Sequence, residues 1–365
     1  MNETKPFFFR RASYFLITIV LSIIILRQGQ FVLGPLAFAI LFTIMIQPIC
    51  NFFERLVKKK IPAVLLALLS VIIVLGGIIF LFSMQFSNII QDLPDITQKI
   101  SSGIERIMEW LRETIGLTQS DIQQNISKLV DNSMAYIQKG IVTSTTFLFN
   151  AFLTFLFTFF LLWYRNSIRN FLLIQASNTN RENFKKILNQ IKKTVQHYLY
   201  GLLIVIAILA VLNSVGLLII GIDYAVFWGV LAAFLAVIPY IGTTLGGTLP
   251  FIYAVATTDN WWQPLAVVGM YMVIQNIEGN IITPNIVGSS VAINPLVALI
   301  ALIIGGFIWG VGGIILAIPV VAIFKVIFEH QNQYKPLAML MSSKVHKNEN
   351  EFIKDFDNDR HRLKR

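Results

Sequence analysis

The stretch IPYIGTTLGGTLP, Ile238 to Pro250, interrupts one of the longest apolar parts of the chain. It lies within Tyr224–Thr258, 35 uncharged residues, which as one straight helix would measure about 52 Å against about 30 Å of bilayer hydrocarbon. Pro239 prevents a regular helix from continuing, and Gly242 permits a tight reversal. Gly242 and Gly246 are also spaced as a small-residue face on which another helix can pack closely. The stretch therefore predicts the tip of a helical hairpin.

The composition of the whole chain is that of an integral membrane protein. Hydrophobic residues make up 56% of the 365 residues, charged residues make up 13%, and the mean hydropathy is +0.70, outside the range of soluble globular proteins. Uncharged runs of membrane-helix character occur at Ala12–Leu26, Gln28–Phe53, Ile61–Gln91, Gly140–Tyr164, Tyr198–Ile222, Tyr224–Thr258, Asn260–Ile277 and Gly279–Phe324. We expect an all-α polytopic membrane protein with about eight transmembrane helices, two of them Pro/Gly-broken or re-entrant hairpins.

The net charge of +10 is carried by loops and ends rather than by one patch. Lys and Arg precede the first apolar run, follow the second and are frequent in 165–197, whereas 92–139 has seven acids and five bases. By the positive-inside rule both termini and 165–197 are cytoplasmic, and 92–139 is external. This distribution accounts for the charge without nucleic-acid binding.

The charge pattern and the apolar periodicity divide the chain into six parts. We expect three transmembrane helices in 1–91, an extracytoplasmic helical insert in 92–139, a fourth transmembrane helix in 140–164, a cytoplasmic amphipathic basic helix in 165–197, a transport core with broken helices in 198–328, and a charged cytoplasmic tail in 329–365. The insert either forms a small subdomain or packs against a neighbouring subunit.

A second interrupted segment occurs at Asn294–Phe324, 31 uncharged residues that contain Pro295, Pro319 and five central glycines. Non-helical backbone at membrane depth persists only where protein or a water-filled cavity satisfies its peptide groups. Paired interrupted segments in the two halves of a membrane protein point to a transport site. The alternative is that the glycines serve only close helix packing.

Two membrane topologies fit these interruptions. If both segments are full spans, Asp259–Trp262 is cytoplasmic and Gly279–Asn294 is external. If both are hairpins that enter from opposite sides, the two assignments are exchanged. Neither loop contains Lys or Arg, so the charge pattern does not choose between them.

Polar residues gather between the two interruptions. Helical spacing places Gln275 and Glu278 on one face, and Asn276 and Asn280 on another. Glu278 is the only acid between Asp259 and Glu329. An acid within a membrane segment indicates a functional group, because burying its charge is costly. The alternative is a carboxylate at the membrane boundary that water reaches.

The order IPYIG, QNIEGNIITPNIVG, INPLVALIALIIGG, WGVGG and LAIPVV resembles the autoinducer-2 exporter family of bacterial membrane proteins, the PerM-like permeases. The matching positions are Pro239, Gly242, Gln275, Glu278, Pro284, Gly288, Pro295, Gly310, Gly313 and Pro319. The resemblance covers the whole chain and implies eight membrane helices or their hairpin equivalent, in the bacterial cytoplasmic membrane. It also implies homo-oligomers of five subunits, export of small polar molecules and, for some relatives, sodium or lithium exchange for protons.

We therefore expect a gradient-driven transporter that exports a small polar or hydroxylated solute of autoinducer-2 type. The expected substrate path comprises Pro239, Tyr240, Gly242, Thr243, Thr244, Gly246, Gln275, Asn276, Asn280, Asn294, Gly310 and Gly313. Glu278 is the expected carrier of a coupling proton or cation. The alternatives are a monovalent cation/proton antiporter, and a channel or non-transporting membrane scaffold.

Several chemistries have no support in the sequence. There is no GxxxxGK[ST] loop for nucleotide hydrolysis and no HExxH or Ser-His pairing inside a span, so we do not expect an enzyme. Cys50 is the only cysteine, and the four histidines lie at membrane interfaces or in the tail. We therefore expect no metal site and no cofactor.

Overall fold

The computed structural model describes residues 5–86, 146–176, 181–238, 241–258, 260, 262–288, 291–331 and 333–343. Within these residues the regular structure is helical, apart from one isolated β-bridge between Ile293 and Ser342. Six helices are long and apolar enough to cross a membrane, and two shorter apolar helices accompany them. The all-α polytopic fold expected from the sequence is thereby confirmed. The insert 92–139, Pro239, Tyr240 and the tail beyond 343 lie outside the described residues.

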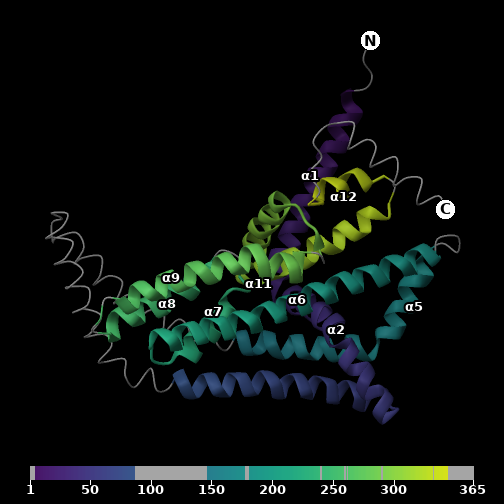
Figure 1. The fold of residues 1–365 in the computed structure, drawn as a ribbon. Helices are drawn as coiled ribbons and strands as arrows, with labels where there is room; N and C mark the ends of the chain where they lie inside the picture. The colour runs from purple at the N-terminus through teal and green to yellow at the C-terminus, as the bar shows by residue number, and fades with distance from the viewer. Residues whose placement is uncertain are drawn as a thin grey trace. The chain divides into compact units, whose positions relative to one another are not determined.

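Figure 1 shows the helices in chain order. They are α1 (Lys5–Gln28), α2 (Gln30–Val57), the helices Lys60–Phe86 and Thr146–Trp163, α5 (Arg165–Gln175), α6 (Arg181–Ile220), α7 (Ala225–Leu235), α8 (Ile241–Thr257), α9 (Trp262–Ile277), the π-helices η2 (Glu278–Ile282) and η3 (Pro284–Gly288), α11 (Pro295–Glu329) and α12 (Lys335–Met341). The basic amphipathic segment before residue 197 includes α5 and the first turns of α6. It is not separate from the next span, because α6 continues for 40 residues.

The chain folds into two compact units. Unit 1 comprises Met1–Ala67, Asn150–Tyr198 and Val291–Arg365. Unit 2 comprises Leu68–Phe149 and Leu199–Ser290. Each predicted interruption therefore lies in its own unit, the first in unit 2 and the second in unit 1.

The first interruption forms the hairpin of α7 and α8 in unit 2, whose helices lie side by side in Figure 1. A Cβ atom added to Gly242 would collide with the carbonyl oxygen of Leu235, and one added to Gly246 would lie 3.0 Å from the Cβ of Ala232. The two arms thus approach each other through the glycines of α8. This contact confirms both the predicted reversal and the predicted small-residue face.

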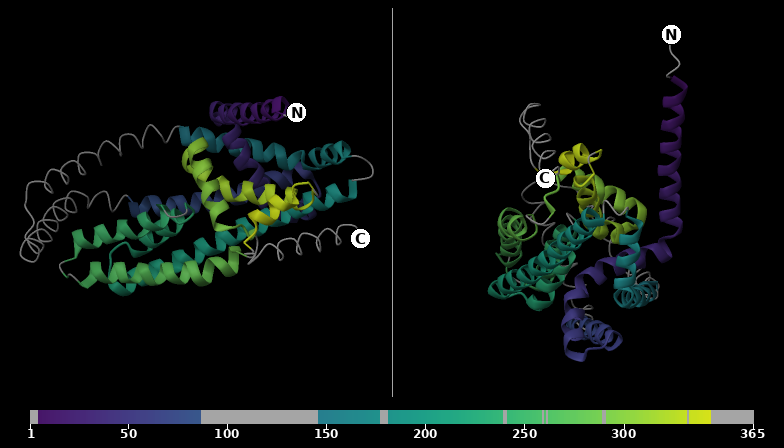
Figure 2. Two further views of the ribbon diagram at one scale, coloured as in Figure 1. Left: turned by 90° about the horizontal axis from the view of Figure 1, so that it is seen from above. Right: turned by 90° about the vertical axis from the view of Figure 1, so that its right-hand side faces the viewer.

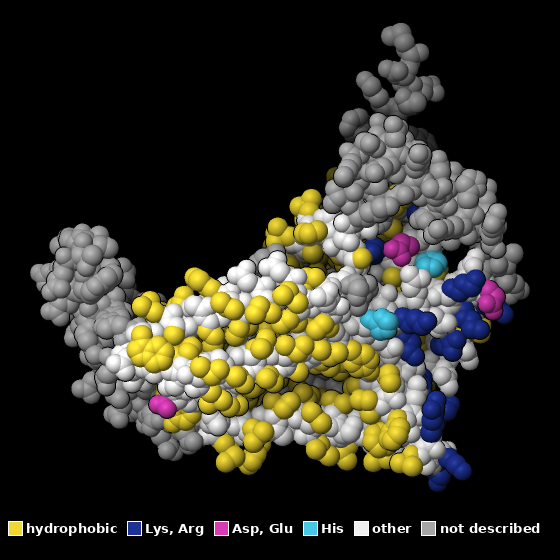
Figure 3. Space-filling view, viewed as in Figure 1, with side chains coloured by type: hydrophobic (Ala, Val, Ile, Leu, Met, Phe, Trp, Pro, Cys, Tyr) yellow, Lys and Arg dark blue, Asp and Glu magenta, His cyan; other side chains and the backbone are white. Residues whose placement is uncertain are grey.

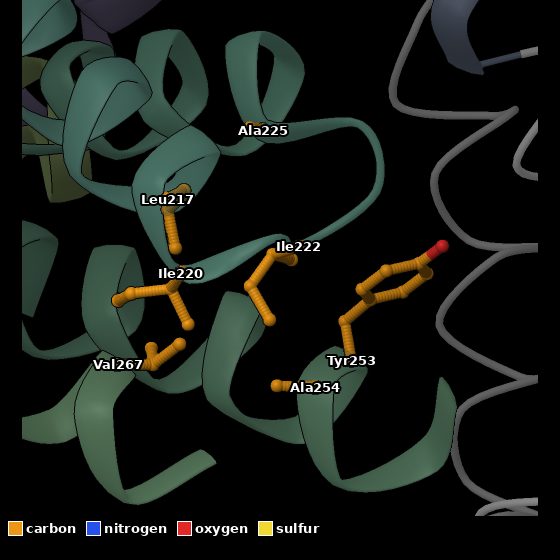
Figure 4. Close-up of a cluster of buried hydrophobic side chains, with 7 residues drawn as sticks. All are labelled: Leu217, Ile220, Ile222, Ala225, Tyr253, Ala254 and Val267. Carbon is orange, nitrogen blue, oxygen red and sulfur yellow. The ribbon is translucent and has the colours of Figure 1, made fainter. Parts of the chain in front are cut away.

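The base of this hairpin is closed by side chains at the two ends of the α7–α8 segment. The Gln263 amide nitrogen, at the start of α9, donates to the carbonyl oxygens of Ile220 (3.1 Å) and Gly221 (3.4 Å), at the end of α6. A buried apolar cluster packs beside these bonds and is drawn in Figure 4: Leu217, Ile220, Ile222, Ala225, Tyr253, Ala254 and Val267. We call it cluster A. The end of α6 and the start of α9, which flank the hairpin in the chain, therefore lie next to each other.

The second interruption is a reversal within α11 in unit 1. Trp309 (φ −133°, ψ 21°) and Gly310 (φ 59°, ψ −138°) leave the helical conformation. The backbones of Gly305 and Gly313 touch, because a Cβ added to either glycine would collide with the carbonyl oxygen of the other. In a straight helix these residues would be about 12 Å apart along the axis. The predicted central interruption is thus confirmed.

Proline does not make the turn of the second hairpin. In α11 the turn is made by Trp309 and Gly310, and the positive φ of Gly310 suits a residue without a Cβ atom. Pro295 instead begins the helix, and Pro319 lies within its second arm. The expectation that a proline marks the reversal therefore does not extend to the second hairpin.

Two contacts pin the tip of the second hairpin to the end of α1, within unit 1. The indole nitrogen of Trp309 donates to the carbonyl oxygen of Leu26 at 2.8 Å. The Arg27 guanidinium lies 4.8 Å from the centre of the Phe307 ring, a favourable cation–π distance. The tip thus has polar partners although the surrounding sequence is apolar.

The base of the second hairpin is also closed by hydrogen bonds. The N–H of Asn294 donates to the carbonyl oxygen of Met341 (2.8 Å), and the N–H of Ser343 donates to that of Ala292 (3.0 Å). From the second arm, the buried Lys325 ammonium donates to the carbonyl oxygens of Val291 (3.1 Å) and Ala292 (2.9 Å). The beginning and the end of α11 therefore lie together, next to α12, as Figure 2 shows.

Charged and apolar side chains occupy different elements. In Figure 3 the Lys and Arg side chains gather around α5 and the first part of α6, whereas apolar side chains cover much of α8 and α9. On α5 the side chains of Phe171 and Ile174 are exposed, and Arg165 pairs with Glu54 of α2. This pattern is typical of a helix at a membrane interface.

The backbone contacts predict a specific sensitivity to added methyl groups. Gly242→Ala and Gly313→Ala should each lower stability by about 1–3 kcal/mol, because the hairpin arms must separate to admit a Cβ atom. Thermal unfolding of the purified protein measures this effect. Gly269→Ala on α9 is the matched control, since a Cβ atom there meets nothing within 4 Å. Equal melting temperatures for all three variants would contradict the packing described here.

Candidate functional site

The candidate site is the polar end of α9 and the π-helices that follow it, in unit 2. Regular α-helix stops at Ile277, and η2 and η3 continue the chain with wider turns from Glu278 to Gly288. π-Helical turns are rare and occur frequently at functional sites. Here the change of helix type coincides with the only acid in this part of the sequence.

Glu278 is held by two neutral donors. The amide nitrogen of Gln275 donates to Oε2 of Glu278 at 2.8 Å, and the hydroxyl of Thr283 donates to Oε1. The ion pairs among the described residues, Arg165–Glu54 and Lys325–Glu329, do not include Glu278. The carboxylate is half-buried, so its charge is oriented by hydrogen bonds without being neutralised by a cation. Acidic side chains within membrane segments commonly have a functional role.

The two asparagines near Glu278 bond to their own helix. The Asn276 amide donates to the carbonyl oxygen of Met272 at 2.9 Å, and the Asn280 amide donates to that of Asn276 at 3.0 Å. Both side chains are exposed, and each keeps its amide oxygen as an acceptor. Together with Gln275 they form an exposed polar face on the α9–η2 segment.

Helix α8 packs against α9 next to this polar segment. A Cβ atom added to Gly247 would lie 3.3 Å from Cγ of Tyr271, so the glycine makes room for the tyrosine ring. Thr243 and Thr244 occupy the first turn of the same helix, with Thr244 exposed. The hairpin arm and the polar segment are therefore neighbours within unit 2.

The predicted path residues and the predicted coupling residue Glu278 are divided between the two units. Unit 2 contains Gly242, Thr243, Thr244, Gly246, Gln275, Asn276, Glu278 and Asn280, and unit 1 contains Asn294, Gly310 and Gly313. Pro239 and Tyr240 lie outside the described residues.

Asn294 has a local role that the sequence did not indicate. Its side chain caps α11 by accepting from the N–H of Leu296 at 2.8 Å, and its backbone N–H bonds to Met341. An N-cap of this kind satisfies an orphan donor of the first helical turn. The structure thus ties Asn294 to the base of the second hairpin.

Four polar groups are buried without a partner, and of their residues only Tyr271 was singled out by helical spacing, on the face of Gln275 and Glu278. Asn213 Oδ1, Ser214 Oγ, Trp228 Nε1 and the Tyr271 hydroxyl are buried in unit 2 without a hydrogen-bond partner. A signal was available, because Asn213 and Ser214 are adjacent polar residues in the apolar run Tyr198–Ile222. Among the described residues, no cluster of three or more His, Cys, Asp and Glu side chains has the arrangement of a metal site.

Comparison with known proteins places this architecture in a family. The AI-2E family transporter profile matches residues 14–333. The chain belongs to the AI-2E family of transporters. It is 26% identical over 335 residues to the Bacillus subtilis protein named "Putative transport protein YueF", covering 85% of this chain and 90% of that protein. It is 24% identical over 322 residues to the Escherichia coli "AI-2 transport protein TqsA", covering 87% and 91%.

Family membership confirms the resemblance seen in the sequence motifs. A match over nearly the whole chain, together with the apolar helices, makes this a multi-pass bacterial membrane protein with a role in transport. A small solute and the lipid bilayer are accordingly its partners. The motif from Gln275 to Gly288 that carries the resemblance falls on the π-helical segment with Glu278.

The hydrogen bond between Thr283 and Glu278 can be tested directly. Thr283→Val leaves one oxygen of the half-buried carboxylate unpaired and should lower stability by about 1–2 kcal/mol. Thermal unfolding gives the measurement, with Thr248→Val as control because the Thr248 hydroxyl bonds only to its own helix, at Thr244. In a Glu278→Gln background the loss should be smaller. The same loss in both backgrounds would show that the bond does not depend on the carboxylate.

Proposed function

We propose that this AI-2E family protein is a gradient-driven transporter that exports a small polar or hydroxylated solute of autoinducer-2 type. The proposal is supported by the family and by the name of the relative TqsA, an AI-2 transport protein. The sequence carries no nucleotide-binding GxxxxGK[ST] loop, so an ion or solute gradient is the energy source we propose.

The observation that carries the proposal is that each interrupted segment forms a hairpin closed at its own base. Helix α7 has 11 residues, or roughly 16 Å, about half of the hydrocarbon thickness. The stretch Trp262–Gly288, which connects the first hairpin to the second, has 27 residues and can cross the bilayer once. We propose that the two hairpins then enter the membrane from opposite sides.

This topology agrees with the positive-inside rule. A cytoplasmic basic tail places the base of α11 on the cytoplasmic side, because Asn294 is bonded to Met341. The base of the α7–α8 hairpin then faces the outside, with Asp259–Trp262 external and Gly279–Asn294 cytoplasmic. Paired re-entrant hairpins of opposite direction are a recurring plan of secondary transporters, with the substrate near the midplane.

Within unit 2 we propose that the solute follows the first turns of α8 and the polar face of α9 and η2. The residues are Gly242, Thr243, Thr244, Gly246, Gln275, Asn276 and Asn280, and Tyr240 beside the reversal belongs to the same proposal. Their groups are neutral donors and acceptors, which suit hydroxyl groups better than a strongly charged substrate. Gly310 and Gly313 would let the backbone of the second hairpin bend during transport.

A second function is favoured by the surroundings of Glu278. A half-buried carboxylate with two neutral donors and no ion pair suits a site that binds protons and monovalent cations in turn. This arrangement supports a sodium or lithium/proton antiporter, or the same exchange as the coupling step of solute export. We further propose that the chain works as a homo-oligomer, of five subunits by the family resemblance.

Reconstitution into proteoliposomes tests the function. Saturable solute uptake that depends on a proton or sodium gradient is the expected result. Sodium flux coupled to protons without solute would instead establish the antiporter. Unsaturable current, or no flux of either kind under any gradient, would contradict both and leave a channel or a scaffold.

The topology predicts opposite accessibility for two engineered cysteines. In a Cys50→Ser background, Asn260→Cys should react with an impermeant maleimide in intact cells, whereas Gln333→Cys should react only after permeabilisation. Both positions are exposed, and serine keeps an acceptor for the bond from Arg165 to residue 50. Labelling of both cysteines from the same side would overturn the assignment of opposite hairpins.

Substitution of Glu278 separates coupling from assembly. Glu278→Gln keeps one oxygen, which can accept from either Gln275 or Thr283, but its amide cannot carry a charge. Uptake should therefore lose its dependence on the pH gradient while the protein remains folded and assembled. Glu182→Gln is the control, because Glu182 is an exposed acid in the first turn of α6. Unchanged pH dependence in Glu278→Gln would exclude the carboxylate from the coupling mechanism.

A further inference from the structure

The interior of unit 2 contains buried polar atoms that have no protein partner. Asn213 (4% exposed) and Ser214 (7% exposed) lie on α6, and the unpaired atoms are Asn213 Oδ1 and Ser214 Oγ. Trp228 Nε1 on α7 and the Tyr271 hydroxyl on α9 are unpaired as well. An unsatisfied buried polar group destabilises a protein, and lipid offers it no substitute partner.

Most hydroxyls in the described helices are paired, although Thr43 Oγ1 and Asn150 Oδ1 in unit 1 are also buried without a partner. Hydroxyls on membrane helices ordinarily bond to the carbonyl oxygen four residues earlier. Thr18, Ser83, Thr154, Thr158, Thr248, Thr257 and Thr258 all do so in this chain. The Ser214 hydroxyl makes no such bond and has no hydrogen-bond partner in the protein.

The unpaired groups share one level, between two apolar clusters of unit 2. Cluster A contains Leu217 and Val267, and a second cluster, cluster B, contains Val205, Leu209, Ala233, Ile274 and Ile282. On α6, Asn213 lies one turn from Leu209 and one turn from Leu217. On α9, Tyr271 lies one turn from Val267 and about one turn from Ile274. Both helices thus place a polar residue at the boundary between cluster A and cluster B.

Helices α7 and α8 bring their backbones to the same level through glycine. A Cβ atom added to Gly229, next to Trp228, would collide with N and Oγ of Ser214. Gly247 of α8 lies beside the Tyr271 ring. A Cβ atom added to this glycine would lie 3.3 Å from Cγ of Tyr271. Met270, adjacent to Tyr271, packs against both clusters, which places this level between them.

We propose that Asn213, Ser214, Trp228 and Tyr271 form a buried binding site for a small neutral hydroxylated solute. This site deepens the proposed transport function and rests on it. Asn213 Oδ1 only accepts, the Trp228 indole only donates, and the two hydroxyls do both. Each hydroxyl group of a polyol can both donate and accept, so a polyol can pair with all of these groups. The four groups are uncharged, and the apolar clusters on either side disfavour an ion.

The test combines stability with binding, using erythritol, a neutral four-carbon polyol, as the probe. Millimolar erythritol should raise the melting temperature of the full chain in lipid nanodiscs saturably, whereas succinate, a charged four-carbon compound, should not. Asn213→Leu should melt higher without the probe, because an unpaired acceptor has been removed, and should bind erythritol about tenfold more weakly or worse. Tyr271→Phe should likewise weaken binding about tenfold.

Asn189→Leu is the matched control, since Asn189 is an exposed asparagine on the same helix. It should bind erythritol like the wild type. Wild-type binding in both Asn213→Leu and Tyr271→Phe, or no saturable erythritol shift in the wild-type protein, would overturn the proposed site. So would equal shifts with erythritol and succinate.

Flux measurements distinguish failure of the site from failure of the function. Gradient-driven uptake of a solute that is unchanged in Asn213→Leu would leave the transporter intact and remove the site. Absence of any gradient-driven flux in the wild type would refute the proposed function. Loss of erythritol binding in Asn213→Leu and Tyr271→Phe would still support the site in that case.

Discussion

The structure depends on the need of every peptide group within a bilayer to find a hydrogen-bond partner inside the protein. A helix meets this need along its length, but a reversal at membrane depth does not. The described residues show hydrogen bonds beside one reversal and at the bases of both hairpins. In the second hairpin the Trp309 indole bonds to the end of α1, and in both hairpins the base is closed by hydrogen bonds, through Gln263 in one and Asn294 in the other.

Glycine makes these hairpins possible because close helix contact, rather than the hydrophobic effect, holds helices together in lipid. Gly242 and Gly246 bring α8 against α7, and Gly305 meets Gly313 across the second reversal. At such sites the missing side chain is the stabilising feature. The same contacts leave the arms without the interlocking side chains that would resist bending, which suits segments that move during transport.

The polar groups of unit 2 fall into two kinds, those that are hydrogen-bonded and those that are not. Gln275 and Thr283 hold Glu278 at the start of the π-helical segment, whereas the side-chain oxygens of Asn213 and Ser214 have no protein partner at all. The first arrangement orients a charge, and the second leaves neutral groups unpaired in the interior, where we propose that a solute binds. The ion-coupled transport of a neutral solute that we propose would need both kinds of site.

The sequence by itself determined the membrane class, the all-α fold, the family and the positions of both interruptions, because hydropathy and Pro/Gly content act locally. It also predicted that Gln275 and Glu278 share a face, since helical spacing alone brings them together. Only the tertiary structure showed that Trp309 and Gly310 turn α11, that Asn294 and Lys325 close its base, and that Asn213 and Tyr271 share a level. These features depend on contacts between segments far apart in the chain, and periodicity along one helix carries no record of which groups lie opposite it.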